Sequence, residues 1–263
     1  MFARILPPHP LLVRLLVPLL LTGCIGSTAV ENVILEKAGR KGMVSVYEDA
    51  SFSIHSFPER WAQVDATDFV ASLHSALNHH RMLLHAPERK VTIYAHSSQS
   101  YDTSNGSSGL NNYDEGSFDF ICCDKKIAAH ELGHLVTYAR TGGSPRLFVD
   151  EGMAEFLADS NEAQSTTGGR LVPDYPCNSS LTIEEIYDNA GFSRSYTGDT
   201  APYPMAAQFT AIAINRSSVD RYLESYYKPA QFGTSDDGDS LLKRFLGLGF
   251  AEMELEMSRA GCQ

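Results

Sequence analysis

His130-Glu131-Leu132-Gly133-His134 is the stretch from which the fold and the chemistry of this chain can be worked out. On an α-helix, residues four apart lie on one face about a turn apart, so the two imidazoles can reach the same metal ion. Glu131 projects from the neighbouring side of that turn, where it can contact a water held by the metal rather than the metal itself. The stretch therefore predicts a helix that carries two metal ligands, His130 and His134.

A third ligand must come from elsewhere, because a catalytic zinc usually binds three protein ligands and keeps a fourth position for water. Gly and Pro residues within 142–145 are expected to end the first helix. A second helix, over about 146–158, can then run antiparallel to the first. It carries the sequence Asp150-Glu151-Gly152-Met153-Ala154-Glu155-Phe156.

Glu151 and Glu155 are four residues apart and therefore share one face of this second helix. We expect Glu151 to be the third metal ligand and Glu155 to orient a ligand imidazole by a hydrogen bond. Asp150 is a minor alternative ligand. In the alternative interpretation both glutamates are solvated charges on an exposed helix face, but the upstream stretch favours the metal site.

The two stretches together resemble the gluzincin metallopeptidases, which take two His from one helix and a Glu from a following helix. The run Glu-Gly-Met-Ala-Glu-Phe is most similar to the matching segment of bacterial collagenase-type peptidases and of related small families. The resemblance covers roughly residues 125–160 and is loose elsewhere. The spacing between the stretches is shorter than in the thermolysin and collagenase patterns. The resemblance implies a zinc peptidase with a zincin-like (thermolysin-like) α+β fold.

Other zincin classes fit this sequence less well. A metzincin would carry Gly and His where this chain has Thr137 and Arg140, and the Gly-Thr-x-Asp context of aspzincins is absent. The upstream Gly-x-Met-x-Asn motif of gluzincin aminopeptidases is also missing. These differences favour an endopeptidase that acts on protein or peptide.

The family resemblance also indicates how such a site acts. Zinc lowers the pKa of its bound water towards about 7, and Glu131 would accept the water proton and pass it to the leaving amine. The metal stabilises the developing oxyanion, and a tyrosine usually assists. Tyr203 is similar in position to a tyrosine that precedes the corresponding helix of collagenase-type enzymes. The alternative is a loop aromatic that packs under that helix.

Gluzincin-like folds bind extended substrate along the edge strand of their sheet by backbone pairing. Residues 117–121 alternate and contain aromatics, which predicts such a strand just before the first metal helix. The Ser-Asn-Gly-Ser-Ser-Gly run at 104–109 predicts a loop before it. The alternative is a plain edge strand of the core sheet without a role in binding.

The first 23 residues are typical of a targeting segment, with Arg4 and Arg14 in a positive region and a short apolar core from Leu15 to Leu21. This core ends in Leu21-Thr22-Gly23-Cys24, which resembles a bacterial lipobox in which Cys24 is lipidated. The alternative is an ordinary secretory signal. Ile25 does not resemble the Asp of an inner-membrane retention signal, so in a Gram-negative cell we expect the outer membrane. Residues 24–41 would then form the lipidated Cys and a tether, and 42–263 one peptidase domain.

The formal net charge of the chain is −11, and removal of the first 23 residues, with two Arg and no acid, makes it more negative. This balance argues against nucleic acid as a partner, since its recognition needs a basic surface. It also argues against electrostatic docking to anionic lipid, so the lipid anchor is the expected membrane contact.

Four cysteines remain after Cys24, namely Cys122, Cys123, Cys177 and Cys262. An even number in an exported protein suggests two disulfides. Because a bond between neighbours would be strained, we expect Cys122 and Cys123 to pair separately with the other two. A thiolate metal site is the alternative.

The rest of the sequence predicts strands at 43–47, 52–57 and 89–96, and an amphipathic helix over 65–85. That helix carries His74, His79, His80 and His85, which we interpret as a partly solvated face rather than a metal site. Residues 160–176 and 231–239 look like polar connections. Further helices are expected to begin near 180 and to span about 204–215, 217–227 and 250–259. This order predicts a small mixed sheet followed by a mostly helical C-terminal lobe.

We therefore expect a lipid-anchored zinc endopeptidase of the bacterial cell envelope. A non-catalytic lipoprotein that uses the same fold for binding or assembly is the main alternative, and hydrolysis of a non-peptide amide is another. Glu131 favours catalysis, because inactive relatives of such enzymes commonly lose the base or a ligand, and this chain keeps all of them.

Overall fold

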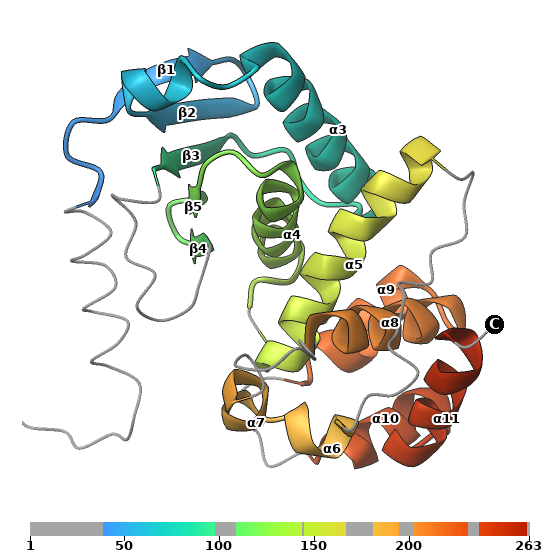
Figure 1. The fold of residues 1–263 in the computed structure, drawn as a ribbon. Coiled ribbons are helices and arrows are strands. Elements are labelled where there is room, and N and C mark those ends of the chain that lie inside the picture. Colours follow the sequence, from blue (N-terminus) through green and yellow to red (C-terminus); the bar gives the residue numbers. More distant parts are fainter. Residues whose placement is uncertain are drawn as a thin grey trace, which may run out of the picture.

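The computed structural model describes residues 39–97, 109–143, 145–166, 181–194, 202–230 and 237–261. Over these residues a mixed five-stranded sheet, interrupted in sequence by helices at Pro58–Trp61 and Ala66–Leu84, is followed by a series of helices (Figure 1), so the expected α+β class is confirmed. The strands are β1 (Val44–Glu48), β2 (Phe52–Ser56), β3 (Val91–His96), β4 (Gly109–Asn112) and β5 (Ser117–Ile121).

The sheet has the order β1-β2-β3-β5-β4. Its three central strands, β2, β3 and β5, run parallel, whereas β1 and β4 pair antiparallel at the two edges. Apolar residues alternate along β2 and β3, so Phe52, Ile54, Val91 and Ile93 are all buried. This period of two places one face of the sheet in the core.

The helices cover this apolar face and then form the rest of the described molecule. They are α2 (Pro58–Trp61), α3 (Ala66–Leu84), α4 (Lys125–Thr141), α5 (Leu147–Thr166), α6 (Ile183–Ile186), α7 (Asn189–Arg194), α8 (Pro202–Asn215), α9 (Val219–Tyr222), the π-helix η2 (Leu223–Tyr227), α10 (Gly238–Leu246) and α11 (Phe250–Gly261). Phe69 of α3 stacks on Phe120 of β5, with ring centroids 6.0 Å apart. Helix α4 packs on α3 and α5, and α5 packs on α8. After α5, the described residues contain helices and no strand, as expected for a helical C-terminal lobe.

Helix α4, which carries the first metal motif, has clear signals at both ends. Asp124 caps its start by accepting hydrogen bonds from the backbone N–H groups of Lys126 and Ile127, at 2.8 and 3.0 Å. Gly142 ends it in the left-handed region at φ 74°, a conformation that glycine adopts without steric cost. The expected end of this helix within 142–145 is therefore confirmed.

Two glycines bring the metal helices close to their neighbours. A Cβ on Gly133 of α4 would lie 3.1 Å from Cα of Ala154 in α5, and one on Gly152 of α5 would lie 2.5 Å from the carbonyl oxygen of Ala206 in α8. Small residues at both crossings therefore set how near α4, α5 and α8 lie to one another.

Several expected elements are confirmed with small shifts in their ends, including the four predicted strands, α3, α8, the α9–η2 segment and α11. The edge-strand prediction is wrong. Strand β5 lies inside the sheet, because β4 folds back antiparallel and covers its outer side. Helix α5 also continues to Thr166 instead of ending near 158, and α10 begins inside the expected 231–239 connection.

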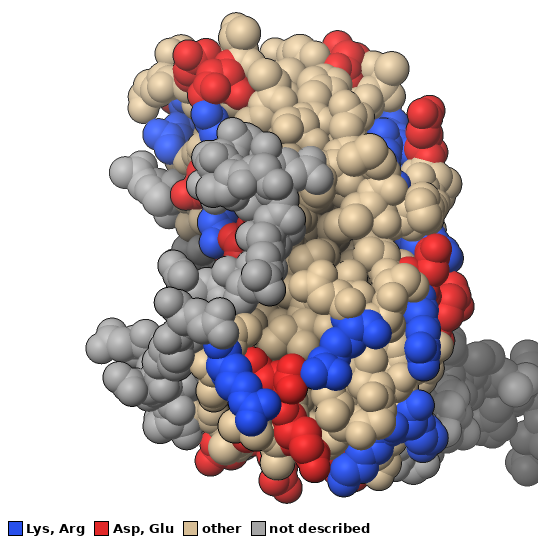
Figure 2. Space-filling model, turned by 90° about the vertical axis from the view of Figure 1, so that its right-hand side faces the viewer, with Lys and Arg blue, Asp and Glu red and all other residues tan. Residues whose placement is uncertain are grey.

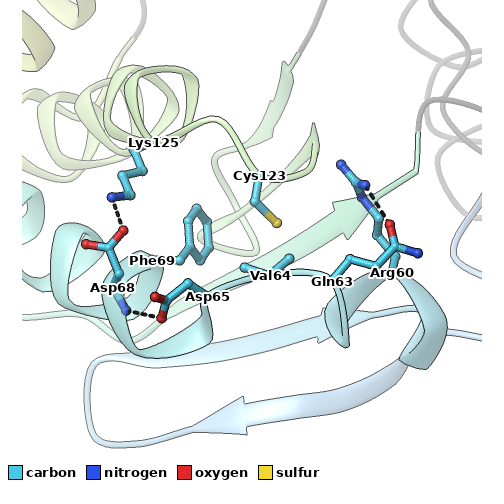
Figure 3. Close-up of a pocket in the computed structure, with 8 residues that line it drawn as sticks. All are labelled: Arg60, Gln63, Val64, Asp65, Asp68, Phe69, Cys123 and Lys125. Carbon is cyan, nitrogen blue, oxygen red and sulfur yellow. Dashed lines mark hydrogen bonds and ion pairs between the residues drawn. The ribbon is translucent and has the colours of Figure 1, made fainter.

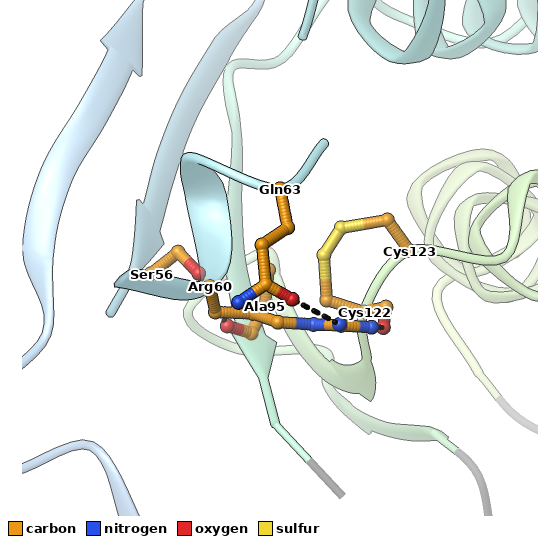
Figure 4. Close-up of a disulfide and its surroundings, with 6 residues drawn as sticks. All are labelled: Ser56, Arg60, Gln63, Ala95, Cys122 and Cys123. Atoms are coloured by element: carbon orange, nitrogen blue, oxygen red, sulfur yellow. Dashed lines mark hydrogen bonds between the residues drawn. A yellow bond between two sulfur atoms is a disulfide. The ribbon is translucent and has the colours of Figure 1, made fainter. Parts of the chain in front are cut away.

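The expected pairing of Cys122 and Cys123 with Cys177 and Cys262 stays a prediction, because the latter two cysteines lie outside the described residues. The side chains of Cys122 and the adjacent Cys123 are in close contact in the connection between β5 and α4 (Figure 4), and Arg60 donates a hydrogen bond to the carbonyl oxygen of Cys122.

Some sequence-based expectations fall on residues that the structure does not describe. They concern the targeting segment at 1–23, Cys24 and most of the tether, the loop before Gly109, Cys177 and Cys262. Among the described helices, none combines the length and the apolar character needed to cross a membrane.

Candidate metal centre

The structure brings His130, His134 and Glu151 together between α4 and α5, although the two histidines and the glutamate come from different helices. The Nε2 atoms of His130 and His134 are 3.1 Å apart. Oε2 of Glu151 lies 3.0 Å from Nε2 of His130 and 3.3 Å from Nε2 of His134. Within the described residues these three form a group whose ligand atoms could hold one metal ion.

The helices that carry these ligands run antiparallel, as expected. Contacts pass from His134 with Glu151, through His130 with Glu155, to Lys126 with Asp159. Residue numbers thus fall along α4 while they rise along α5. The i, i+4 spacing on each helix is what aligns the two sets of side chains.

The carboxylates around the histidines make this centre attractive to a cation. Burial opposes protonation of His130, but hydrogen bonds to Glu151 and Glu155 outweigh it and raise the pKa of His130 to about 9. Burial would likewise raise the pKa of Glu151, but the facing histidines hold that pKa well below its usual value. The centre therefore stabilises positive charge beside an ionised carboxylate.

The second ring nitrogen of each histidine lies close to a carboxylate, within a hydrogen bond for His130 and in a longer contact without hydrogen-bond geometry for His134. Nδ1 of His130 lies 3.0 Å from Oε2 of Glu155, which is the contact expected from the sequence. Nδ1 of His134 lies 3.4 Å from Oδ1 of Asp150. The structure thus places Asp150 behind a ligand, on the side away from the three converging atoms, and not among the ligand atoms.

Glu131 lies at the same centre and is 7% exposed. Burial raises the pKa of its carboxyl group, against the opposing effect of His130 and His134. Strand β4 passes directly beside it, since Asn111 donates a hydrogen bond to Oε2 of Glu131. A Cβ on Gly109 would lie 1.9 Å from Oε1 of Glu131, so a larger residue at this position would have to displace the Glu131 side chain.

Tyr203 lies beside the centre, in the first turn of α8 and not in a loop before the helix. Its ring packs edge-on against His130, with centroids 5.9 Å apart, and also against Phe192, at 5.5 Å. Helix α8 begins earlier than the sequence suggested because Pro202 opens it, a position that suits proline.

The sequence did not single out four polar neighbours of the centre, namely Lys126, Asn111, Tyr113 and Tyr227. Lys126 contacts Glu155 at 2.7 Å, and both tyrosines contact Asp150. Lys126 lies one turn before His130 on the same face of the helix, so its closeness to the centre could have been predicted from the sequence. Asn111, Tyr113 and Tyr227 reach the centre only through the tertiary fold.

The histidines of α3 form no metal group among the described residues, but the expected partly solvated face is wrong for two of them. His79 and His80 are buried, because α5 packs against this part of α3. Nε2 of His79 lies 2.6 Å from Oγ of Ser160 in α5. Burial lowers the pKa of His80 to about 3, so this side chain is a neutral core residue.

A separate hollow of about 270 Å³ lies at the start of α4 (Figure 3). Its lining includes Asp68 and Lys125, which pair with each other, and Cys123. It contains none of the expected ligands. Figure 2 shows basic and acidic side chains interspersed on one face of the molecule, without a field of one sign.

No protein-family model and no curated protein matches this chain. What can be said of the chemistry therefore rests on the sequence motifs and on the geometry of the centre.

Proposed function

We propose that this protein is a zinc-dependent endopeptidase with a zincin-like fold, in which His130, His134 and Glu151 bind the metal and Glu131 is the general base. The observation that carries the proposal is that the ligand atoms of His130, His134 and Glu151 converge beside a further side chain, the buried carboxylate of Glu131. The order of a mixed sheet, a helix pair with the ligands and a helical lobe supports the zincin-like fold.

The ligand atoms fit zinc in both kind and spacing. Two imidazoles and one carboxylate with an open fourth position are typical of catalytic zinc. Tetrahedral ligands at 2.0–2.1 Å from zinc lie about 3.3 Å from one another. The three ligand atoms here are separated by 3.0, 3.1 and 3.3 Å. Zinc, when bound, would supply a Lewis acid that activates water and polarises the scissile carbonyl.

Glu131 is suited to move the proton in this reaction. Its raised pKa brings a carboxylate closer to the range in which it can both accept a proton and release it. We propose that it takes the proton from the attacking water and delivers it to the leaving amine nitrogen. Asn111 holds one oxygen of the carboxylate and so fixes its orientation. Tyr203, beside His130, is the proposed donor to the developing negative charge.

Strand β4, and not β5, is the proposed binding site for the substrate backbone. It forms an edge of the sheet among the described residues, and edge strands are where an extended peptide can add by backbone pairing. It also contacts Glu131 through Gly109 and Asn111. A peptide paired with β4 would therefore run past the catalytic carboxylate, as an endopeptidase requires.

We further propose that the protein is anchored by lipid at Cys24 in the bacterial cell envelope. The support is the targeting pattern of residues 1–23 and the run Leu21-Thr22-Gly23-Cys24. More than one acyl chain is needed for stable anchoring, and a lipoprotein Cys provides several. Incorporation of labelled palmitate in cells, compared with Cys24→Ala, tests this: label in both proteins would contradict it.

The peptidase proposal is tested by zinc content and by cleavage of an unstructured protein such as casein, with protein lacking residues 1–24. The variants are Glu131→Gln, Glu151→Gln and, as a matched control, the exposed Glu88→Gln. We expect one zinc per chain in all but Glu151→Gln. Cleavage should be found only in wild type and Glu88→Gln. Zinc in wild type without cleavage of any unstructured protein would favour a binding module, and no zinc would refute the proposal.

A further inference from the structure

A buried carboxylate next to the metal ligands has contacts that the proposed reaction does not use. Asp150 directly precedes Glu151 and is 5% exposed. Its Oδ1 accepts a hydrogen bond from the hydroxyl of Tyr227 at 2.5 Å and lies 3.4 Å from Nδ1 of His134. Its Oδ2 accepts from the hydroxyl of Tyr113 at 3.3 Å. Both oxygens of Asp150 are therefore directed by named partners.

Tyr227, which contacts Asp150, lies in a helix of unusual geometry. Residues Leu223–Tyr227 form a π-helix, in which the N–H of Lys228 donates to the carbonyl oxygen of Leu223 at 3.0 Å. Its buried residues include the consecutive Tyr226 and Tyr227, which have different partners. Tyr226 donates to Tyr187, whereas Tyr227 donates to Asp150. Such π-helical turns occur frequently at functional sites.

The environment keeps this contact in one protonation state. Burial, followed by the charge of Asp150, raises the pKa of Tyr227 well above its usual value. The hydroxyl therefore keeps its proton and remains a donor to the carboxylate over the whole range in which the protein would work. Tyr227 is only 1% exposed, so water does not readily replace it as that donor.

We propose that Tyr227 is a positioning residue for the metal ligand His134. By holding Oδ1 of Asp150, the hydroxyl of Tyr227 fixes the carboxylate that faces Nδ1 of His134, and so directs Nε2 of His134 towards the metal. A ligand histidine whose second nitrogen faces an ordered carboxylate has a fixed ring orientation and tautomer. The inference rests on the metal-binding part of the proposed function and on nothing about the substrate.

The chain offers two controls of the same chemistry. Tyr226→Phe also removes a buried hydroxyl from η2, but this hydroxyl contacts Tyr187 at 3.4 Å and not Asp150. Tyr113→Phe removes the longer contact, on the oxygen of Asp150 that does not face His134. A purely structural effect would be similar in Tyr226→Phe and Tyr227→Phe.

The test is the zinc affinity of each variant, measured by competition with a chelator, together with the visible absorption spectrum of the cobalt-substituted protein. We expect Tyr227→Phe to bind zinc about 10–100-fold more weakly, the usual cost of losing an outer-sphere partner, with an altered cobalt spectrum. Tyr226→Phe should stay close to wild type, and Tyr113→Phe should lie between them.

If Tyr227→Phe fails to fold, Asp150→Asn replaces it and should show the same loss of affinity. Zinc binding by wild type with equal affinity in Tyr227→Phe and Tyr226→Phe, or an unchanged affinity in Asp150→Asn, would overturn the positioning role and leave the proposed function intact. Absence of zinc binding by wild type would overturn the proposed function, and this inference with it.

Discussion

The two histidines proposed as metal ligands lie beside carboxylates that are themselves held in different ways. Glu155, behind His130, is held by an ammonium group, since Lys126 contacts its Oε1 at 2.7 Å. Asp150, behind His134, is held by phenolic hydroxyls. Burial would raise the pKa of Glu155, but the contacts with His130 and Lys126 lower it to about 2. A carboxylate with such a low pKa stays ionised at any pH at which the histidines can bind a metal.

Glu155→Gln should weaken zinc binding about 10–100-fold, the usual cost of losing an outer-sphere carboxylate. The amide keeps the size of the side chain but not the charge that faces Nδ1 of His130. Zinc affinity by chelator competition measures the effect. Asp159→Asn is a matched control, because Asp159 lies one turn further along α5 and also contacts Lys126, at 3.0 Å. Equal affinities in the two variants would contradict an orienting role for Glu155.

The sequence predicts those parts of the candidate site whose residues lie close together along the chain, and not those whose residues lie far apart. His130, Glu131 and His134 follow from spacing on one helix, and Glu151 with Glu155 from the same spacing on the next. Asp150 was considered only as a ligand, because its sequence position does not tell on which side of the centre its carboxylate lies. Tyr227 donates to Asp150 from 77 residues away. Such a contact depends on how η2 packs, which local patterns do not specify.

At the scale of secondary structure, the metal centre depends on close contact between helices. Gly133 lets α4 approach α5, and Gly152 lets α5 approach α8. Gly152 lies between the ligand Glu151 and the supporting Glu155 on the same helix. Any displacement of α5 from α8 would therefore move both carboxylates relative to the histidines of α4.

Gly152→Ala should destabilise the fold by about 1–3 kcal/mol, the range found for overpacked cores. In an unobstructed helix the same change would instead stabilise by about 1 kcal/mol. The new methyl would lie 2.5 Å from the carbonyl oxygen of Ala206, and backbone cannot yield as a flexible side chain does. Urea unfolding gives the free energy, and zinc affinity should fall too. If the variant were more stable than wild type, this prediction would be wrong, because α5 and α8 could then move apart without a loss in the free energy of unfolding.

The helices with strong periodicity or clear caps were predictable, and the remaining elements had weak local signals. Helix α3 has an apolar stripe, and α4 has an Asp before it and a Gly after it. Strand β4 has the sequence Gly-Leu-Asn-Asn, which lacks the β-branched and aromatic residues that favour strands. It forms because it pairs with β5 and lies against Glu131. This tertiary cause also explains why β5 was mistaken for the edge strand.

For the whole molecule, the metal centre joins parts that are distant in the sequence. Its ligands come from α4, which packs against the sheet, and from α5, which packs against α8 of the helical lobe. Tyr113 follows β4 and Tyr227 ends η2, and both contact Asp150. Metal bound between α4 and α5 would thus hold together the two largest groups of elements in the described molecule.

Zinc should therefore stabilise the whole fold and not only its site. A ligand at 100 times its Kd adds about 2.7 kcal/mol to the free energy of unfolding. In a domain of this size, 1 kcal/mol raises Tm by about 2–4 °C, so zinc should raise it by about 5–10 °C. Calorimetry with and without a chelator measures this. Glu131→Gln should keep the full shift, since Glu131 is not a proposed ligand, whereas Glu151→Gln should lose most of it. A shift that survives in Glu151→Gln would mean that zinc stabilises the protein from another site.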